Sequence, residues 1–248
     1  MAEGLILVTG ASRGIGAAAA RAASALGHAV VVNYAADQGG AEAVVREIQA
    51  AGGVAAAVRA DVGDEAQVLR LFETVDALGP LAGLVNNAGV TGGFCRVEAL
   101  SGETLARVLA VNVAGAMLCA REAVRRMSTA RGGGGGGIVN VSSMAAQLGG
   151  AGEWVHYAAS KGALDSFTVG LAREVAAEGI RVNAVAPGLI ETGLHAEAGA
   201  PDRLQRLAPT IPMGRAGTAE ETAAAIAWLL SPAAAYVTGA VLPVAGGR

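Results

Sequence analysis

The stretch that decides the fold is LILVTGASRGIG, residues 5–16. Its first residues are apolar and predict a strand, three glycines (Gly10, Gly14 and Gly16) mark a turn, and an alanine-rich helix begins near Gly14. Glycines at a strand-to-helix turn let the backbone approach a ligand closely. The first amide hydrogens of a helix, together with its dipole, favour an anion at that point. The segment therefore predicts an α/β fold with a phosphate-binding turn.

Short apolar runs alternate with longer helical stretches over the rest of the chain. The predicted strands are 5–9, 29–33, 54–60, 81–86, 138–142, 180–185 and 240–243. Asp64 with Gln67, and Thr218 with Glu221, have the spacing of residues that cap the first turn of a helix. Strands joined by crossovers of a dozen or more residues pair in parallel and connect right-handedly. The pattern predicts one doubly wound α/β domain over residues 1–248, with helices on both faces of the sheet.

The composition argues against several classes of function. A net charge of −3, with no basic cluster interleaved with aromatics, argues against a nucleic-acid partner. Cys95 and Cys119 have neither paired spacing nor a nearby histidine pair, so we expect two buried thiols and no disulfide or metal site. The N-terminus lacks the features of a signal peptide, and no apolar run reaches membrane-spanning length. These features predict a cytoplasmic protein that does not bind a membrane.

Two segments lack clear periodicity. Residues 132–137 are all glycine, which predicts a flexible surface linker. Residues 189–215 are rich in proline and glycine, which is typical of a lid over a site. Among the histidines, His156 adjoins a tyrosine but points another way on a helix, so we expect a rim residue or substrate contact and not a base. His28 and His195 have no identifiable partner and are expected to be solvated.

Polar side chains within helices are the first candidates for chemistry. Tyr157 and Lys161 lie four positions apart on a helical stretch, so their side chains share one face. On spacing alone, this could also be an ordinary surface pair. Asn112 interrupts the apolar helix 105–118, where asparagine competes with the backbone for hydrogen bonds. The alternative for Asn112 is a tolerated polar residue without a role.

The end of the second strand bears on which dinucleotide could bind. In dinucleotide-binding folds, an acidic residue at this point grips the adenosine ribose and repels a 2′-phosphate. Here the strand ends in Asn33 and Tyr34. Asn33 can hydrogen-bond a phosphate without repelling it, and Arg13 offers a cation to the same corner. These residues favour NADP, while the alternative that Arg13 is a solvated loop cation leaves NAD open.

Six motifs in register carry a resemblance to a known family. They are Thr9-Gly10-x-x-x-Gly14-x-Gly16, Asn86-Asn87-Ala88-Gly89, Asn112, Ser142-Ser143, Tyr157-x-x-x-Lys161 and Pro187-Gly188-x-Ile190-x-Thr192. In this order they resemble the short-chain dehydrogenases/reductases over residues 4–247. Within that family the chain is similar to the 3-oxoacyl-carrier-protein reductases and sugar dehydrogenases.

The resemblance implies a role for each residue of a catalytic set. Tyr157 would be general acid in reduction and general base in oxidation, exchanging a proton with the substrate oxygen. Lys161, as an ammonium, would lower the pKa of Tyr157 and hydrogen-bond the nicotinamide ribose. Ser143 would polarise the carbonyl oxygen, with Ser142 as a rival, because Ser143 stands 14 positions before the tyrosine and many relatives have 13. Asn112 would hold a kink and a water that links the lysine to solvent.

The resemblance also extends the dinucleotide site along the carboxyl ends of the strands. The residues expected to bind the cofactor are Gly10, Ser12, Arg13, Gly14, Ile15, Gly16, Asn33, Tyr34, Asp61, Val62, Asn87, Ala88, Gly89, Tyr157, Lys161, Pro187, Gly188, Ile190 and Thr192. Asp61 and Val62 would contact the adenine, while Ile190 and Thr192 would bind the nicotinamide carboxamide.

The sequence therefore predicts a single-domain, three-layer α/β protein with a seven-stranded parallel sheet, in the order 3-2-1-4-5-6-7 that the resemblance implies. The expected activity is NADP(H)-dependent hydride transfer between nicotinamide C4 and a small carbonyl or alcohol substrate. The alternatives are an NAD-preferring sugar or polyol dehydrogenase and a non-catalytic dinucleotide sensor. Such sensors usually lose the tyrosine or the lysine, and this chain keeps both. By resemblance, the protein is expected to be a homotetramer.

Overall fold

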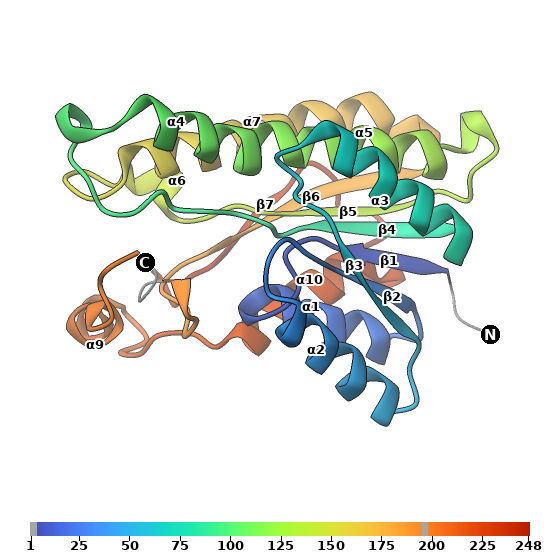
Figure 1. Cartoon of the computed structure of the whole chain (residues 1–248), viewed down its shortest axis with the longest axis horizontal. Coiled ribbons are helices and arrows are strands. Elements are labelled where there is room, and N and C mark those ends of the chain that lie inside the picture. Colours follow the sequence, from blue (N-terminus) through green and yellow to red (C-terminus); the bar gives the residue numbers. More distant parts are fainter. Residues whose placement is uncertain (1–3, 195–197) are drawn as a thin grey trace.

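One parallel sheet of seven strands lies at the centre of the computed structural model, which describes residues 4–194 and 198–248 (Figure 1). The strands are β1 Leu5–Val8, β2 Ala29–Tyr34, β3 Ala55–Arg59, β4 Leu81–Asn86, β5 Gly136–Val141, β6 Ile180–Pro187 and β7 Val241–Val244. Their order is β3-β2-β1-β4-β5-β6-β7, and every pairing is parallel. The predicted order is confirmed, and every strand end lies within two residues of the predicted one.

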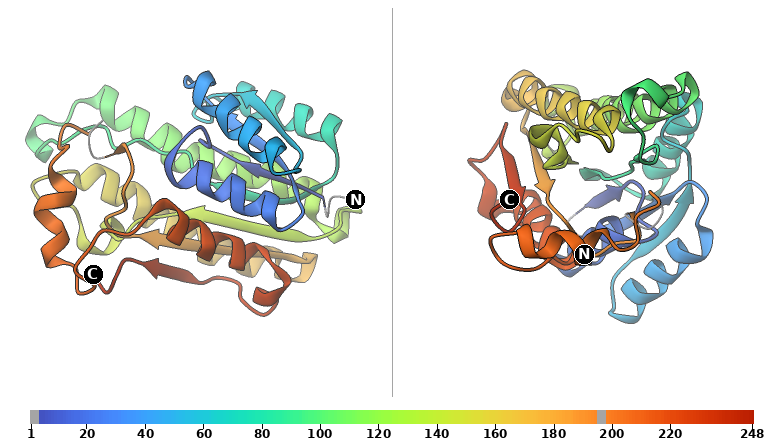
Figure 2. Two further views of the ribbon diagram at one scale, coloured as in Figure 1. Left: turned by 90° about the horizontal axis from the view of Figure 1, so that it is seen from below. Right: turned by 90° about the vertical axis from the view of Figure 1, so that its left-hand side faces the viewer.

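Helices cover both faces of this sheet. Figure 1 shows α1, α2 and α10 on one face and α3, α4, α5 and α7 on the other, and the right panel of Figure 2 shows the sheet between these layers. The helices are α1 Gly14–Ala25, α2 Gln38–Ala50, α3 Glu65–Leu78, α4 Gly102–Leu109, α5 Ala116–Met127, α6 Ala145–Leu148, α7 Val155–Val175, α9 Arg203–Leu207 and α10 Ala219–Leu230. Short 3-10 turns are η1 Val97–Ala99, η3 Thr129–Arg131, η4 Ala176–Glu178, η5 Ala208–Thr210 and η6 Pro232–Ala234, and η2 Ala110–Gly115 is a π-helix.

Two apolar cores fill the spaces between the sheet and its helices. Valines of β1, β2 and β5 pack against an alanine face of α1, Ala17–Ala20, on one side. On the other side, Leu7 and Leu84 pack with Phe72 and the inner face of α5. A sheet buried on both faces requires near-continuous apolar strands, and alanines let a helix lie close to it. This explains how a chain with 3% aromatic residues forms a core.

The predicted helix caps are present. Asp64 accepts hydrogen bonds from the first-turn amides of α3, and Gln67 donates a side-chain hydrogen bond back to it. Thr218 and Glu221 form a reciprocal capping box at the start of α10. Each cap satisfies donors that a helix leaves unpaired at its N-terminus. The local sequence therefore fixes where these two helices begin.

The prediction of a flexible linker at 132–137 was wrong. Gly136 and Gly137 belong to β5 and pair with β6. A Cβ atom at Gly133 would lie 2.3 Å from the carbonyl oxygen of Arg126, and one at Gly136 would lie 2.3 Å from that of Ala82. Gly133 and Gly136 are required because backbone passes against backbone where the chain leads from α5 into β5.

The stretch Gly102–Met127 also departs from the sequence analysis. As one continuous helix of 26 residues, it is long and apolar enough, by length and composition, to cross a membrane. In the structure, Cys119, Ala120 and Ala123 are fully buried in the core between α5 and the sheet. The apolar character of the helix is thus used in covering the sheet.

Several smaller expectations are settled by burial. Cys119 is buried as expected, and burial raises the pKa of its thiol to about 12, whereas Cys95 is partly exposed. His28 is partly buried rather than solvated, and its Nδ1 has no hydrogen-bond partner among the described residues. His195 lies outside the described residues.

Candidate functional site

A cleft with a volume of about 720 Å³ runs along the carboxyl ends of the strands. All the residues predicted to form the site line this cleft except Gly16 and Asn112, which lie behind its wall. Ligands of open α/β sheets bind at this edge, where the strand order reverses beside β1. The topology thus brings together residues from both ends of the chain.

The glycine turn after β1 forms the floor of one end of the cleft. Gly10 and Gly14 have φ values of 61° and 55°, which L side chains rarely adopt. Arg13 occupies the N-cap of α1, and an arginine side chain carries no acceptor that could cap the first amides. The N-terminal residues Gly14 and Ile15 line the cleft, so the positive end of α1 faces it. This is a cradle for an anion.

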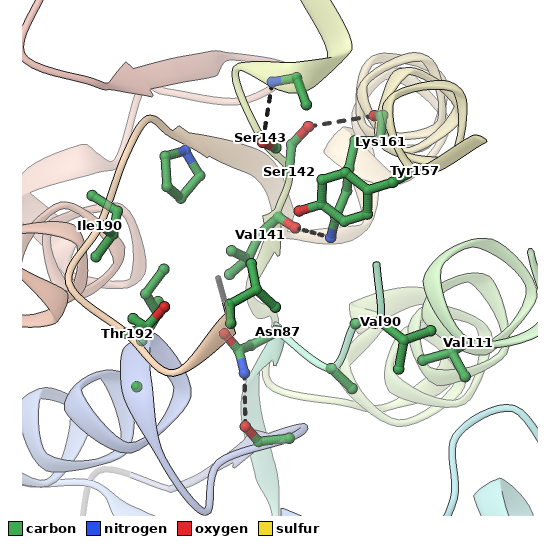
Figure 3. A pocket seen from close by; sticks show the side chains of 18 of the residues that line it. Asn87, Val90, Val111, Val141, Ser142, Ser143, Tyr157, Lys161, Ile190 and Thr192 are labelled. Atoms are coloured by element: carbon green, nitrogen blue, oxygen red, sulfur yellow. Dashed lines mark hydrogen bonds between the residues drawn. The ribbon is translucent and has the colours of Figure 1, made fainter. Parts of the chain in front are cut away.

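Asn87 ties the turn to the end of β4. Its Nδ2 donates hydrogen bonds to the carbonyl oxygens of Thr9 and Gly10, at 2.9 and 2.8 Å. The Thr9 hydroxyl in turn accepts from the amides of Asn87 and Ala88. Figure 3 shows Asn87 at the floor of the pocket. Asn86, just before it, donates to the side chain of Asn140 and to the carbonyl of Ala116, so it links β4 to β5 and α5.

The side chain of Asn33 is already engaged with the backbone. Its Nδ2 donates to the carbonyl oxygens of Val58 and Ala60, and its Oδ1 accepts from the amide of Gly10. Asn33 is 1% exposed. The expectation that this amide contacts a phosphate is therefore corrected: Asn33 lines the cleft but holds β2, β3 and the glycine turn together. Arg13, the other residue predicted for this corner, is exposed and lines the same end of the cleft.

Tyr157, Lys161 and Ser143 meet at the other end of the cleft. Figure 3 shows them on one side of the pocket, with Ile190 and Thr192 opposite. Tyr157 is 8% exposed and Lys161 is 3% exposed. The lysine Nζ donates to the carbonyl oxygen of Val141 at 2.7 Å and lies 5.7 Å from the centre of the tyrosine ring. The predicted one-turn spacing thus places both groups inside the cleft and not on the surface.

The electrostatics of this group differ from the sequence expectation. Burial raises the pKa of Tyr157 to about 12, opposed by a hydrogen bond from Ser143. Burial lowers the pKa of Lys161 to about 8, and the carboxylate of Asp165 one turn later opposes that shift. The hydrogen bond of Lys161 goes to Val141, and the phenol is held by Ser143 instead. The phenol is accordingly protonated at neutral pH.

The two neighbouring serines have different partners. Ser143 hydrogen-bonds the Tyr157 phenol and accepts from the amide of Ala145 at 3.1 Å. Ser142 is 2% exposed and directs its hydroxyl to the carbonyl oxygen of Lys161, at 3.3 Å. Of the two rivals, Ser143 is therefore the one beside the phenol.

Asn112 lies in the π-helix η2, which interrupts the run from α4 to α5. Its Nδ2 donates to the carbonyl of Val90 and the hydroxyl of Ser160, and its Oδ1 accepts from the amide of Val90. A Cβ atom on Gly89 would lie 3.5 Å from both Asn112 Oδ1 and Lys161 Nζ. A helix widens where a side chain competes for its backbone, and such π-turns mark functional sites. The predicted break in the helix is present.

His156 is not a rim residue, contrary to expectation. It is 4% exposed, its Nε2 lies 2.8 Å from the carbonyl oxygen of Thr91, and its Nδ1 lies 4.0 Å from the sulfur of Cys95. His156 is not among the described residues that line the cleft. His156 therefore supports the loop after β4.

A cluster that the sequence analysis did not predict closes the far end of the cleft. Arg203 of α9 forms an ion pair with Glu153 and lies 4.7 Å from the ring centre of Trp154 and 5.3 Å from that of Phe94. The Trp154 and Tyr157 rings lie 5.4 Å apart. Phe94, Glu153 with Trp154, and Arg203 come from three segments far apart in the sequence, so no local spacing signals their contact.

Comparison with known proteins agrees with this geometry. A family model described as enoyl-(acyl carrier protein) reductase matches residues 10–248. A solved short-chain dehydrogenase from Burkholderia cenocepacia, in complex with NADP, has a TM-score of 0.89 and 34% identity, covering 98% of this chain and 96% of that one. The chain belongs to the short-chain dehydrogenase/reductase family. This short-chain dehydrogenase/reductase is therefore an oxidoreductase.

Curated relatives match this short-chain dehydrogenase/reductase along almost its whole length. The oxidoreductase YgfF of Escherichia coli, whose role is uncharacterized, is 53% identical, over 98% of this chain and 99% of its own. The 3-oxoacyl-[acyl-carrier-protein] reductase of Synechocystis is 41% identical, over 97% of this chain and 95% of its own. The cradle of this enzyme fits a dinucleotide, because Gly10, Gly14 and Ile15 line the cleft at the positive end of α1. Gly10 itself cannot carry a side chain without a clash, since a Cβ atom there would lie 2.8 Å from the backbone of Ala88.

Proposed function

We propose that this enzyme uses NADP(H) to reduce a carbonyl group to an alcohol, or to catalyse the reverse reaction, with Tyr157 as general acid and base. The observation that carries the proposal is the buried Tyr157 phenol, hydrogen-bonded to Ser143, in a cleft that is continuous with the anion cradle at α1. The relatives named as reductases and the neighbour titled with NADP support this direction and this cofactor.

The proton chemistry follows from the pKa of the phenol. A pKa near 12 keeps Tyr157 protonated at neutral pH, so it can donate to a substrate oxygen as negative charge develops there. The Ser143 hydroxyl, beside the phenol, donates a second hydrogen bond to that oxygen. Bound NADP(H) supplies or accepts the hydride at nicotinamide C4. In oxidation the same phenol must first lose its proton, and this requires added positive charge beside the ring.

Lys161 has two tasks in the proposal. A cationic ammonium favours the phenolate that forms after proton donation. Because Lys161 already contacts the carbonyl of Val141 at 2.7 Å, its remaining donors can reach a ribose hydroxyl of the cofactor. Asn112 anchors the loop after β4 through the carbonyl of Val90, and it anchors α7 through the hydroxyl of Ser160. We therefore assign it a positioning role in the proton path. The variant Asn112→Ala, which should lose turnover, tests this role.

The cofactor preference rests on the cation at the adenosine end. Arg13 is exposed there, where it can pair with a 2′-phosphate, and strand β2 ends without an acidic side chain. Asp37, at the N-cap of α2, lines the same end, and its carboxylate accepts from the amide of Gly40 at 3.0 Å. That carboxylate favours the alternative, an NAD-preferring sugar or polyol dehydrogenase.

The two cofactors can be compared by thermal shift and by steady-state kinetics. The proposal predicts that NADP raises the melting temperature more than NAD at equal concentration. Arg13→Ala should weaken NADPH binding by about tenfold, because one charge-assisted contact is lost. NADH binding should stay within about twofold of the wild-type value. Equal stabilisation by NADP and NAD would favour the alternative.

The reaction itself is tested with NADPH that carries deuterium at nicotinamide C4. A panel of ketones and aldehydes should include compounds whose alcohol product carries one deuterium at the former carbonyl carbon. Consumption of NADPH without deuterium in the product would contradict hydride transfer to a carbonyl. A purely sensory protein would bind the cofactor, consume no NADPH and form no deuterated alcohol.

The remaining features of the proposal concern the whole chain. We propose one catalytic domain over residues 1–248, with residues 189–215 as the substrate lid and residues 195–197 within it outside the described structure. A homotetramer in the cytoplasm is the proposed form of the enzyme. Sedimentation of the purified protein tests the assembly.

A further inference from the structure

Arg203 is a buried cation at the substrate end of the cleft. It is 5% exposed, lines the cleft, and lies on α9 within the lid segment. Figure 1 shows α9 and α6 at the same end of the molecule. Its guanidinium lies 4.7 Å from the ring centre of Trp154, and that ring neighbours Tyr157. A charge is rarely buried unless it is paired, so each nitrogen of the Arg203 guanidinium is expected to have a hydrogen-bond partner.

Only one edge of this guanidinium is occupied. Nη1 donates to Glu153 at 2.5 Å. Nε is buried, and among the described residues neither Nε nor Nη2 has a hydrogen-bond partner. These two nitrogens share the side-on edge of the group, whose parallel donors match the two oxygens of a carboxylate. A buried unpaired donor costs free energy unless a ligand satisfies it.

We propose that this edge of Arg203 binds a carboxylate of the substrate, so that the enzyme acts on keto acids or hydroxy acids. The inference rests on the proposed function, because it names the substrate class of the same site. The ion pair with Glu153 holds the guanidinium in orientation, and the faces of Phe94 and Trp154 support it. The free edge then fixes one end of the substrate while its carbonyl lies at Tyr157.

The charges nearest to the proposed carboxylate site are the guanidinium of Arg203 and the carboxylate of its partner Glu153. A monoanionic carboxylate suits Arg203 better than a phosphate dianion, because Glu153 lies on the guanidinium and repels added negative charge. The anion cradle for the cofactor is formed at α1, by other residues.

The experiment compares keto acids with their methyl esters. Suitable pairs are 4-acetylbenzoate, levulinate and 4-oxocyclohexanecarboxylate, each against its ester, with NADPH saturating. We expect wild-type kcat/KM to favour the acid in at least one pair by about 10-fold or more. Arg203→Met should lower kcat/KM for that acid by about 10- to 100-fold, mainly through KM, and change the ester by less than about threefold. Arg203→Lys should restore part of the preference.

Arg206→Met is the matched control. Arg206 lies on the same helix, is exposed and does not line the cleft, so this variant removes a charge from α9 without touching the ligand edge. It should keep the preference for the acid. The NADPH dissociation constant should be the same in wild type and Arg203→Met, since the proposal gives Arg203 no contact with the cofactor.

Two results would overturn the inference. If Arg203→Met lowered kcat/KM equally for the acid and the ester, the role of Arg203 would be limited to holding the lid in place. A wild-type enzyme that prefers no acid in any pair, whether it reduces the esters or not, would also reject it. In that case, if the esters were still reduced and the reduction depended on Tyr157, the proposed function would stand. If no carbonyl compound in the wider panel were reduced, the proposed function itself would be rejected.

Discussion

Gly16 offers a sharp test of how the glycine turn is built. A Cβ atom there would lie 2.4 Å from Asn87 Nδ2 and 2.5 Å from the carbonyl oxygen of Gly10. Real Cβ atoms essentially never come that close to other heavy atoms, so Gly16→Ala must move α1, Asn87 or the turn. Any such movement disturbs the two hydrogen bonds from Asn87 that join the ends of β1 and β4.

The expected cost of Gly16→Ala can be worked from these contacts. Overpacking costs about 1–3 kcal/mol, and weakening two hydrogen bonds adds about 1 kcal/mol or more. Replacing glycine by alanine in a helix returns about 1 kcal/mol. We therefore predict that the free energy of unfolding falls by about 1–3 kcal/mol and that NADPH binding weakens by about tenfold or more, because the cradle shifts.

Urea unfolding and a fluorescence titration with NADPH measure the two effects. Gly39→Ala is the control, since Gly39 lies in α2 and a Cβ atom there meets nothing within 4 Å. It should be neutral or stabilising by up to about 1 kcal/mol. If Gly16→Ala were as stable as the wild type and bound NADPH equally well, the close packing of this turn would not be what shapes the site.

Three further predictions concern charge and hydrogen bonding. Glu122 is 3% exposed and, although burial raises its pKa, hydrogen bonds from Arg126 and Arg121 hold the pKa below the ordinary value. Glu122→Gln should therefore lower the free energy of unfolding by about 1–2 kcal/mol at pH 7, as measured by urea unfolding. The difference in stability between variant and wild type should shrink below about pH 4, because the native carboxylate then takes up a proton. Asn112→Ala should cost about 2 kcal/mol or more by leaving buried partners unpaired, and should lower kcat in the NADPH assay; unchanged stability and kcat would remove its anchoring role. The pH profile of ketone reduction should fall above about pH 8 as Lys161 loses its proton, well before the phenol titrates near 12, and a flat profile to pH 10 would contradict that assignment.

Sequence patterns were sufficient for the architecture, because strand and helix signals here are strong and local. The glycine turn, the caps at Asp64 and Thr218, and the break at Asn112 each depend on neighbours within one or two turns of chain. The order of the strands came from the family resemblance, and the structure confirms it. Parallel pairing and right-handed crossovers leave few other arrangements for such a pattern.

Contacts between side chains far apart in the chain could not be predicted from the sequence. Asn33 was given a phosphate because of its place in the strand, yet β3 and the glycine turn take all its hydrogen bonds. The glycines at 132–137 looked flexible because composition does not show which backbone will lie against them. The contact between Arg203 and Glu153 joins residues 50 positions apart. Each of these depends on tertiary packing, which overrides local signals.

The central claim is that the buried Tyr157 hydroxyl donates the proton. Single-turnover reduction of a ketone by Tyr157→Phe, with NADPH bound, tests it most directly. Because phenylalanine keeps the ring beside Trp154 and removes only the hydroxyl, NADPH affinity should stay within about twofold while the rate falls by about 10²- to 10⁴-fold. A variant that reduces the ketone within a few-fold of the wild-type rate would contradict the account.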